Sequence, residues 1–278
     1  CQAIFPIVRD VPVFNPEVEQ HDQEWFQSLY SARNRTEELQ TDYLVKERRF
    51  VAEFAAAQKL SGPCLEVGCG VGLFADLVPG FIGLEYALRA LFTPGFESYS
   101  KVCGDARRLP FARASMQCVM SFNTLEHVPE VHEAFAEFDR VLKPGGYLVL
   151  KPAWHCQRYI TELIHVLPLR RLTMRQKAIR ISLPLLNSKP YKFASHVPSR
   201  LWRRMGVTRR NEMVWRKLTP YHGVEWVADA DAVASIDSHE AILFYTRKGY
   251  TSISHPTAMR QILAGHDIVV LQKGDRRL

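Results

Sequence analysis

The sequence lacks the features that mark several protein classes. Its six cysteines show no C-x-x-C spacing, which argues against a zinc-binding module. No apolar run reaches the roughly 18 to 20 residues that a membrane-spanning helix needs, and no secretory signal is visible. Internal repeats and low-complexity tracts are also missing. We therefore expect a globular, cytoplasmic protein whose thiols are reduced and buried.

Acidic residues are almost missing from one long segment. Between Trp154 and His222 there are 15 Lys and Arg but only two acids, Glu162 and Glu212, so this segment carries a charge of +13. The rest of the chain has 21 basic and 27 acidic residues and is mildly acidic. Such a charge asymmetry indicates that the basic segment binds an anionic partner, if it binds one at all.

Short apolar runs alternate with helical patterns through the middle of the chain. A helix is predicted over 41–60, where Leu44, Val51, Phe54 and Ala55 share one face, and another over 130–142. Short helices are also predicted after the first and second apolar runs. This alternation predicts an α/β fold, a Rossmann-like open sheet that is mostly parallel and carries helices on both faces. The five predicted strands are 63–69, 80–86, 100–106, 116–123 and 147–153.

A glycine-rich turn follows the first predicted strand. Gly68, Gly70 and Gly72 give G-x-G-x-G, and Leu73 stands where a dinucleotide-binding turn needs its third glycine. The match to a pyrophosphate-binding fingerprint is therefore imperfect, and a nicotinamide-dependent oxidoreductase is disfavoured but left open.

Three acids accompany this turn at the ends of the first three strands. Glu66 lies in the first strand, Glu85 ends the second and Asp105 ends the third. Because the ends of parallel strands meet at one crevice, these carboxylates are predicted to line one pocket. Such a pocket suits a ligand with a positive centre, ribose hydroxyls and an exocyclic amine better than a pyrophosphate. S-adenosylmethionine has all of these groups.

Five motifs occur together in the order "LEVGCGVG", "GLEYA", "GDARRLPF", "FNTLEHV" and "FDRVLKPGGYLVL". With them, residues 63–150 resemble the class I S-adenosylmethionine-dependent methyltransferases of the group that includes the ubiquinone- and sterol-type enzymes. The resemblance implies an enzyme with S-adenosyl-L-methionine as cofactor and S-adenosyl-L-homocysteine as product.

The resemblance also implies a role for each cofactor residue. The turn would place its backbone against the methionine part, with Glu66 organising that end through water. Glu85 would hold the ribose, Asp105 and its neighbour would contact the adenine, and the residues after the fourth strand would lie near the reactive methyl. The implied cofactor residues are Glu66, Gly68, Cys69, Gly70, Glu85, Tyr86, Asp105, Ala106, Asn123 and Thr124.

No metal site is predicted. The segment "FPIVRDVPVF" after Cys1 resembles the tail of a zinc-ribbon-like segment that precedes some methyltransferases. Only Cys1 of such a site is present, so we carry over no metal.

Two histidines are the candidates for a general base. Methyl transfer from a sulfonium is a direct displacement, and a base is needed only where the acceptor must lose a proton, as a hydroxyl does. His127 and His155 follow the fourth and fifth strands and are predicted as catalytic residues. Further candidates are Tyr221, His222, Asp229 and Asp231.

The basic segment predicts short amphipathic helices over an acceptor site, in "RYITELIHVL", "TMRQKAIRISL" and "SRLWRRMG". The second begins with a T-x-x-Q capping pattern at Thr173, and the third has a serine start at Ser199 and a glycine stop. Three interpretations stay open: a solvated lid, a site for an anionic small molecule, glycan or lipid-linked acceptor with peripheral membrane contact, and an RNA-binding surface. O-methylation is the default expectation. A catalytically silent cofactor-binding module is a further alternative, and the sequence predicts no oligomeric state.

These patterns divide the chain into four parts. The predicted parts are an N-terminal extension (1–40), a cofactor-binding core (41–153), a basic helical lid inserted after the fifth strand (154–236), and a closing part (237–278). The closing part contains a helix with an N-cap serine in "SHEAILFYTRKG" and strands in "YTSIS" and 267–273, which add an antiparallel closing strand to the sheet.

Overall fold

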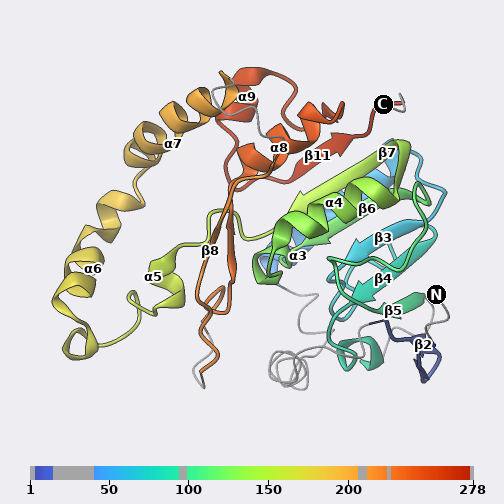
Figure 1. Ribbon diagram of the computed structural model, residues 1–278, viewed down its shortest axis with the longest axis horizontal. Coiled ribbons are helices and arrows are strands. Elements are labelled where there is room, and N and C mark those ends of the chain that lie inside the picture. Colours follow the sequence, from blue (N-terminus) through green and yellow to red (C-terminus); the bar gives the residue numbers. More distant parts are fainter. Residues whose placement is uncertain (1–3, 15–40, 94–98, 206–211, 224–226, 276–278) are drawn as a thin grey trace. The chain divides into compact units, whose positions relative to one another are not determined.

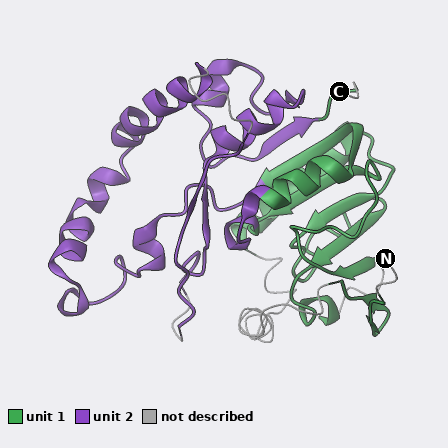
Figure 2. Cartoon of the chain, in the orientation of Figure 1, with its two compact units in different colours: residues 1–124, 133–150, 273–278 green, residues 125–132, 151–272 purple. Residues whose placement is uncertain are grey.

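The computed structural model of the 278-residue chain describes residues 4–14, 41–93, 99–205, 212–223 and 227–275. The chain forms two compact units (Figure 2). Unit 1 contains residues 1–124, 133–150 and 273–278, and unit 2 contains residues 125–132 and 151–272. Among the described helices, none combines the length and apolar character that crossing a bilayer requires.

The main sheet has seven strands in the order β10-β11-β7-β6-β3-β4-β5 (Figure 1). Strand β3 pairs in parallel with β4 and β6, and β4 pairs in parallel with β5. Strands β10 and β11 pair antiparallel. The predicted mostly parallel sheet with an antiparallel closing strand is thereby confirmed. The strands are β3 (Cys64–Val67), β4 (Phe81–Glu85), β5 (Ser100–Cys103), β6 (Met116–Phe122), β7 (Leu142–Lys151), β10 (Thr251–Ser252) and β11 (Val269–Gln272).

The central strands are buried along their length. All four residues of β3 are buried, and in β6 only Gln117 is partly exposed. Near-continuous apolar strands of this kind are typical of a parallel sheet that is covered on both faces. Glu66 is the exception in β3, and the register places it between Gly83 of β4 and Met120 of β6.

Two helices of the predicted kind bury the expected residues. Helix α3 (Asp42–Ala57) buries Leu44, Val51, Phe54 and Ala55, and the Phe54 ring meets Tyr147 of β7 edge-on at 5.5 Å. Helix α4 (Val131–Val141) completely buries two phenylalanines, Phe135 and Phe138. The "KPGG" stretch, expected to close this helix, belongs instead to β7, which begins directly after α4.

The helix predicted after the glycine turn is absent. Residues 72–78 form consecutive turns, with amide-to-carbonyl bonds from Gly72 to Cys69 (2.7 Å) and from Leu77 to Phe74 (3.0 Å). Gly72, the first residue of the predicted helix, has a φ of +67° and therefore cannot itself be part of a right-handed helix. The short helix predicted after β4 is a single 3-10 turn, η1 (Ala90–Phe92).

The N-terminal residues form a small hairpin in unit 1. Strands β1 (Ile7–Val8) and β2 (Val11–Pro12) pair antiparallel. Arg9 and Asp10 both have positive φ, which suits the tight turn between twisted strands. Val13 then bridges to Cys103 of β5. The rest of the predicted extension, residues 15–40, lies outside the described residues.

The basic segment forms three helices, which differ in part from the prediction. Helix α5 (Arg158–Thr161) is a single turn, because Leu163 adopts a φ of +54° and interrupts the longer helix that was expected. Helix α6 (Met174–Leu186) has the predicted capping box between Thr173 and Gln176. Helix α7 (Lys189–Arg204) begins after Ser188, not at Ser199, and the glycine predicted to end it lies outside the described residues.

Several elements of unit 2 were not predicted. Strands β8 (Trp215–Lys217) and β9 (Ala234–Ile236) form an antiparallel ribbon, and helix α9 (Ala258–Ile262) separates β10 from β11. Helix α8 (Ser238–Arg247) was predicted with a serine N-cap, but the cap is Asp237. Its carboxylate accepts from the amide of His239 at 2.7 Å, and an aspartate serves this purpose as well as a serine.

Candidate active site

The glycine turn after β3 is fixed against strand β4. The amides of Gly68 and Cys69 both donate to the carbonyl of Leu84, at 2.8 and 3.1 Å. Gly68, Gly70 and Gly72 have φ values of +74°, +52° and +67°. Residues with a β-carbon rarely adopt such values without strain, and this explains why glycine occupies all three positions.

Glu85 lies beneath this turn and is only 5% exposed. Its Oε2 accepts from the amide of Gly70 at 2.8 Å, and its Oε1 accepts from the amide of Ala87 at 2.9 Å. The carboxylate therefore connects the glycine turn to the loop after β4 and has a fixed orientation. The predicted contact between Glu85 and a ribose stays a prediction.

Glu66 is the most enclosed of the predicted acids, at 2% exposure. Its Oε2 has no hydrogen-bond partner among the described residues. Burial raises the pKa of this carboxyl group well above its usual value, and the nearby charges of Glu85 and Glu47 raise it further. Burial likewise raises the pKa of the Cys69 thiol, which interacts with the hydroxyl of Tyr99.

Asp105 forms an ion pair that the sequence analysis missed. Its carboxylate accepts from the backbone amide of Arg107 at 2.8 Å and from the guanidinium Nη2 of the same residue at 2.6 Å. This hydrogen bond raises the pKa of Arg107. The spacing of the two residues in "GDARR" was the available signal. Of the neighbouring predicted residues, Ala106 is buried and Tyr86 is half-buried.

The end of β6 is tied to the end of β3 by hydroxyl groups. Ser121 donates to the carbonyl of Val67 at 2.9 Å, and the Thr124 hydroxyl lies 2.8 Å from the carbonyl of Phe122 and 3.2 Å from that of Gly68. Asn123 is exposed and has a φ of +45°. Thr124 is thereby held directly against Gly68.

The residues of unit 1 fit the predicted cofactor. All ten predicted cofactor residues lie in unit 1, in or just beyond the carboxyl ends of β3, β4, β5 and β6. A β-carbon at Gly68 would overlap the side chain of Thr124, so only glycine lets the turn pack this closely against the residue that follows β6. The buried Glu66 Oε2 still needs a donor, which an ammonium group or a water bound to it supplies.

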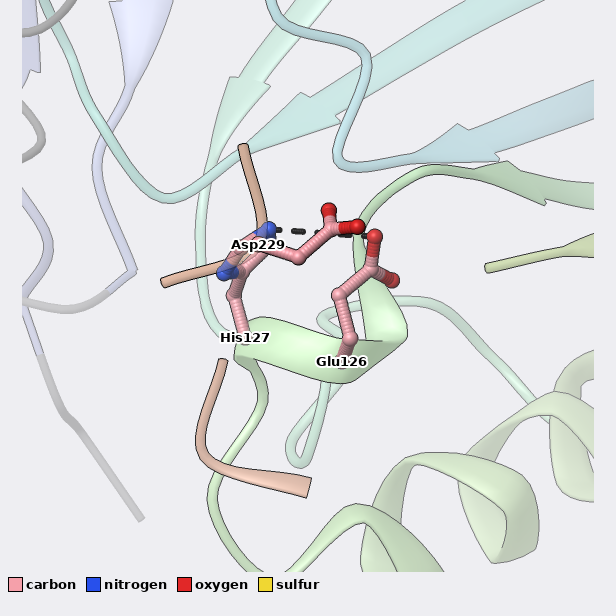
Figure 3. Close-up of side chains that lie close together, drawn as sticks. All are labelled: Glu126, His127 and Asp229. Atoms are coloured by element: carbon pink, nitrogen blue, oxygen red, sulfur yellow. Dashed lines mark ion pairs between the residues drawn. The ribbon is translucent and has the colours of Figure 1, made fainter. Parts of the chain in front are cut away.

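The predicted catalytic residue His127 belongs to unit 2, where it lies among carboxylates (Figure 3). It follows Glu126 on a 3-10 turn, η2 (Leu125–His127). Its Nδ1 is 3.3 Å from Asp231, and its Nε2 is 3.7 Å from Glu126. Asp229 comes from a separate segment and points toward the same group. Two of the further candidates, Asp229 and Asp231, are thus brought to His127.

Opposing effects act on the protonation of this cluster. Burial favours the neutral imidazole, but the charges of Glu126, Asp231 and Asp229 outweigh it and raise the pKa of His127. Burial raises the pKa of Glu126, and neither of its oxygens has a hydrogen-bond partner in the described part of the chain. The imidazolium therefore stabilises the fold fully below its ordinary pKa, and this contribution is lost as the pH rises through the raised value.

Replacing Asp231 by asparagine should lower the pKa of His127, because it removes a carboxylate 3.3 Å from Nδ1 while keeping the side-chain shape. The measurement is an NMR titration of the imidazole proton signals. Asp267→Asn, which removes an exposed carboxylate of the same unit, is the control and should leave the pKa of His127 unchanged. An unchanged His127 titration in Asp231→Asn would contradict the arrangement.

Glu126, His127 and Asp229 form the only cluster of three or more potential metal ligands within the described ranges. The ligand atoms of Glu126, His127 and Asp229 all lie within 4.8 Å of one another. One imidazole and two carboxylates could hold a divalent cation such as Mn²⁺ or Zn²⁺. We assign no metal to the site, because the raised pKa of His127 favours an imidazolium, which cannot ligate a cation.

The second predicted catalytic histidine, His155, lies in unit 2 among other basic groups and one acid, Asp237, whose Oδ1 is 4.0 Å from its Nε2. Its Nε2 lies 3.3 Å from Nη2 of Arg200, a donor, so the imidazole accepts there and is neutral. Its ring stacks on His196 and meets His266 edge-on. Burial lowers the pKa of His155 to about 4, and Arg200 opposes protonation further. His155 is thereby a much weaker base than His127.

The remaining candidates, Tyr221 and His222, are half-buried in the same unit. The amide of Tyr221 donates to the carbonyl of Ala230 at 2.8 Å, next to Asp229 and Asp231. The residue that sequence reasoning missed here is Glu126. Its position next to the candidate His127 in "NTLEHV" was the available signal.

Comparison with known proteins shows similarity to methyltransferases in the central part of the chain. Residues 65–150 match the model of a family described as a methyltransferase domain. Malonyl-(acyl-carrier protein) O-methyltransferase of a Methylovorus species is 32% identical over 102 positions, covering 31% of this chain and 34% of that protein. A Mycolicibacterium smegmatis protein named a "probable S-adenosylmethionine-dependent methyltransferase" is 35% identical over 107 positions, covering 34% of this chain and 42% of that protein.

The chain thus spans between a third and about two fifths of the length of the curated relatives it matches. Among solved structures, the S-adenosylmethionine-bound CalS10, an amino pentose methyltransferase from Micromonospora echinaspora, is 25% identical. The match covers 46% of this chain and 54% of that one, with a TM-score of 0.33.

Proposed function

We propose that this chain, a class I S-adenosylmethionine-dependent methyltransferase by its residues 65–150, methylates an anionic acceptor at oxygen. The buried pair Glu66 and Glu85 around the glycine turn of unit 1 supports the methyl donor, and the charge of the basic segment carries the choice of acceptor. When bound, the cofactor supplies an electrophilic methyl group. The residues of the turn and the strand ends would bind and orient it.

The anionic acceptor is inferred from the charge of the basic segment. Residues 154–222 carry +13, while the rest of the chain is mildly acidic. A positive surface attracts anionic molecules and raises their local concentration. Small phosphorylated or acidic sugars and lipid-linked glycans therefore fit this segment better than neutral acceptors. RNA is a second candidate, since Trp202 and other aromatic residues lie among its cations, although no RNA-binding motif is present.

We assign the general base of an O-methylation to His127. A hydroxyl acceptor must lose a proton, and an imidazole held by a carboxylate is suited to accept it. Asp231 at Nδ1 orients His127 and stabilises its charged form. His155 has the lower pKa of the two, about 4, and its Nε2 already accepts from Arg200.

The test combines cofactor binding with turnover. Calorimetry should show tight binding of S-adenosylhomocysteine and none of NAD, and tight NAD binding alone would overturn the proposal. A homocysteine-release assay across acidic sugars, phospholipid-linked glycans and tRNA then identifies the acceptor class. Uniform inactivity despite tight cofactor binding would favour a silent binding module.

Variants separate the base from the cofactor site. With an active acceptor, His127→Gln should reduce turnover by about 10²- to 10⁴-fold, the usual contribution of a general base, while S-adenosylhomocysteine affinity stays unchanged. His132→Gln is the matched control, because His132 is an exposed histidine of the same segment. Equal turnover in the two variants would remove His127 from the reaction.

A further inference from the structure

Helix α6 carries an apolar stripe that no other described part of the chain covers. None of its residues is buried. Met174, Ile181 and Leu185 are 78%, 79% and 63% exposed. With Ala178 they follow one another at spacings of four, three and four residues, which places them on one face of the helix. A helix of a globular domain normally buries such a face.

Helix α7 follows α6 along the chain (Figure 1), and its two faces also differ. One face is attached to unit 2 by Arg200, which is paired with Asp237, and by Arg203, which is paired with Glu240. The opposite face exposes four large apolar side chains at helical spacing. They are Tyr191, Leu201, Trp202 and, just after the helix, Met205.

The basic residues around these apolar side chains have few acidic neighbours. From residue 169 to residue 205 there are ten Lys and Arg and no Asp or Glu. Arg200 and Arg203 are paired with acids, and the guanidinium groups of Arg180 and Arg204 meet a carbonyl and Gln261. Within the described ranges the other six form no ion pair: Arg170, Arg171, Arg175, Lys177, Lys189 and Lys192.

We propose that residues 169–205, the α6–α7 segment, dock on the surface of an anionic lipid bilayer. The apolar stripe of α6 would enter the boundary between headgroups and acyl chains, and Arg175 and Lys177 on either side of it would meet lipid phosphates. The inference goes beyond the proposed methyl transfer, because docking requires neither a bound cofactor nor turnover.

The kind of apolar side chain favours a bilayer over RNA. Single-stranded nucleic acids are bound through aromatic rings that stack on bases. The exposed stripe of α6 contains Met, Ala, Ile and Leu and no aromatic residue. The aromatic residues that α7 exposes, Tyr191, Phe193 and Trp202, suit the headgroup region of a bilayer, where amphipathic rings are enriched. A second copy of the chain fits less well, because two α6–α7 segments would bring ten positive charges of each copy together without acids.

The first test measures sedimentation of the full chain with vesicles. Vesicles of phosphatidylcholine with 30% phosphatidylglycerol should bind the protein, and pure phosphatidylcholine should not. Each basic residue at an anionic surface strengthens binding by about fivefold, so Arg171→Gln with Arg175→Gln and Lys177→Gln should weaken it by roughly 100-fold. The matched control removes three cations of unit 1 by Lys46→Gln, Lys59→Gln and Arg113→Gln, and should change binding by less than about threefold.

The second test addresses the apolar stripe. Ile181→Ser with Leu185→Ser should abolish the binding that survives 0.5 M salt, where charge attraction alone is screened. Equal losses in the two triple variants would show a net-charge effect and overturn the proposal. Tighter binding to tRNA than to anionic vesicles, or dimerisation that depends on Ile181 without vesicle binding, would also overturn it. S-adenosylhomocysteine affinity, measured on the same variants, reports separately on the proposed function.

Discussion

Replacing Glu85 by alanine should weaken S-adenosylhomocysteine binding at least tenfold, a loss of about 1.4 kcal/mol or more. The carboxylate is predicted to accept from the ribose, and it also holds the amides of Gly70 and Ala87 at 2.8 and 2.9 Å. Its removal would leave two enclosed amides without their acceptor, at a cost of about 1–3 kcal/mol each. The melting temperature should therefore fall together with the affinity.

Calorimetry and circular dichroism at a temperature where the variant is folded separate these two effects. Glu53→Ala is the control, because it removes a carboxylate of unit 1 that is exposed and pairs only with the exposed Arg49. Such a surface pair contributes little, so both affinity and melting should stay near those of the unaltered chain. An unchanged affinity in folded Glu85→Ala would mean that the ribose contact is misplaced.

Gly68→Ala should be the most damaging single methyl addition in unit 1. The new β-carbon would lie 2.6 Å from Cβ of Thr124 and would overlap the rest of that side chain. The φ of +74° adds strain of about 1–2 kcal/mol, and forced overpacking adds about 1–3 kcal/mol. We expect a loss of roughly 2–5 kcal/mol in the free energy of unfolding, with loss of S-adenosylhomocysteine binding.

Gly249→Ala separates the effect of backbone strain from the effect of the overlap with Thr124. Gly249 has a φ of +87°, but a β-carbon there meets nothing within 4 Å. This variant therefore shows the backbone strain alone, and chemical denaturation should give a loss of about 1–2 kcal/mol. Similar losses at the two positions would contradict the close approach of Thr124 to Gly68.

The strands and the acids at their ends could be predicted from the sequence. Runs such as "PCLEVGC" and "MQCVMSFN" are mostly apolar, which is typical of strands covered on both faces in an α/β protein. Glu66, Glu85 and Asp105 could be placed at one edge because parallel strands end together. The helix after β3 could not be rejected, since the apolar spacing of its residues is helical.

The partners of the site residues could not be predicted. Glu85 was expected to face a ligand, yet its carboxylate also anchors the glycine turn. His127 was chosen as one of two histidines, and only the fold brings Asp231 to its ring and Arg200 to that of His155. These pairs join residues far apart in the sequence, so no local pattern contains them.

The sequence by itself determined the strand order along the chain, the glycine turn, the acids beside it and the basic segment. Periodicity, propensity and charge act over a few neighbouring residues, and these features need nothing more. The tertiary structure decided which acid meets which donor, which histidine is the stronger base, and that the stripe of α6 stays exposed. Each depends on burial and on contacts between distant segments, because burial changes the protonation of a group and packing decides which apolar face is covered.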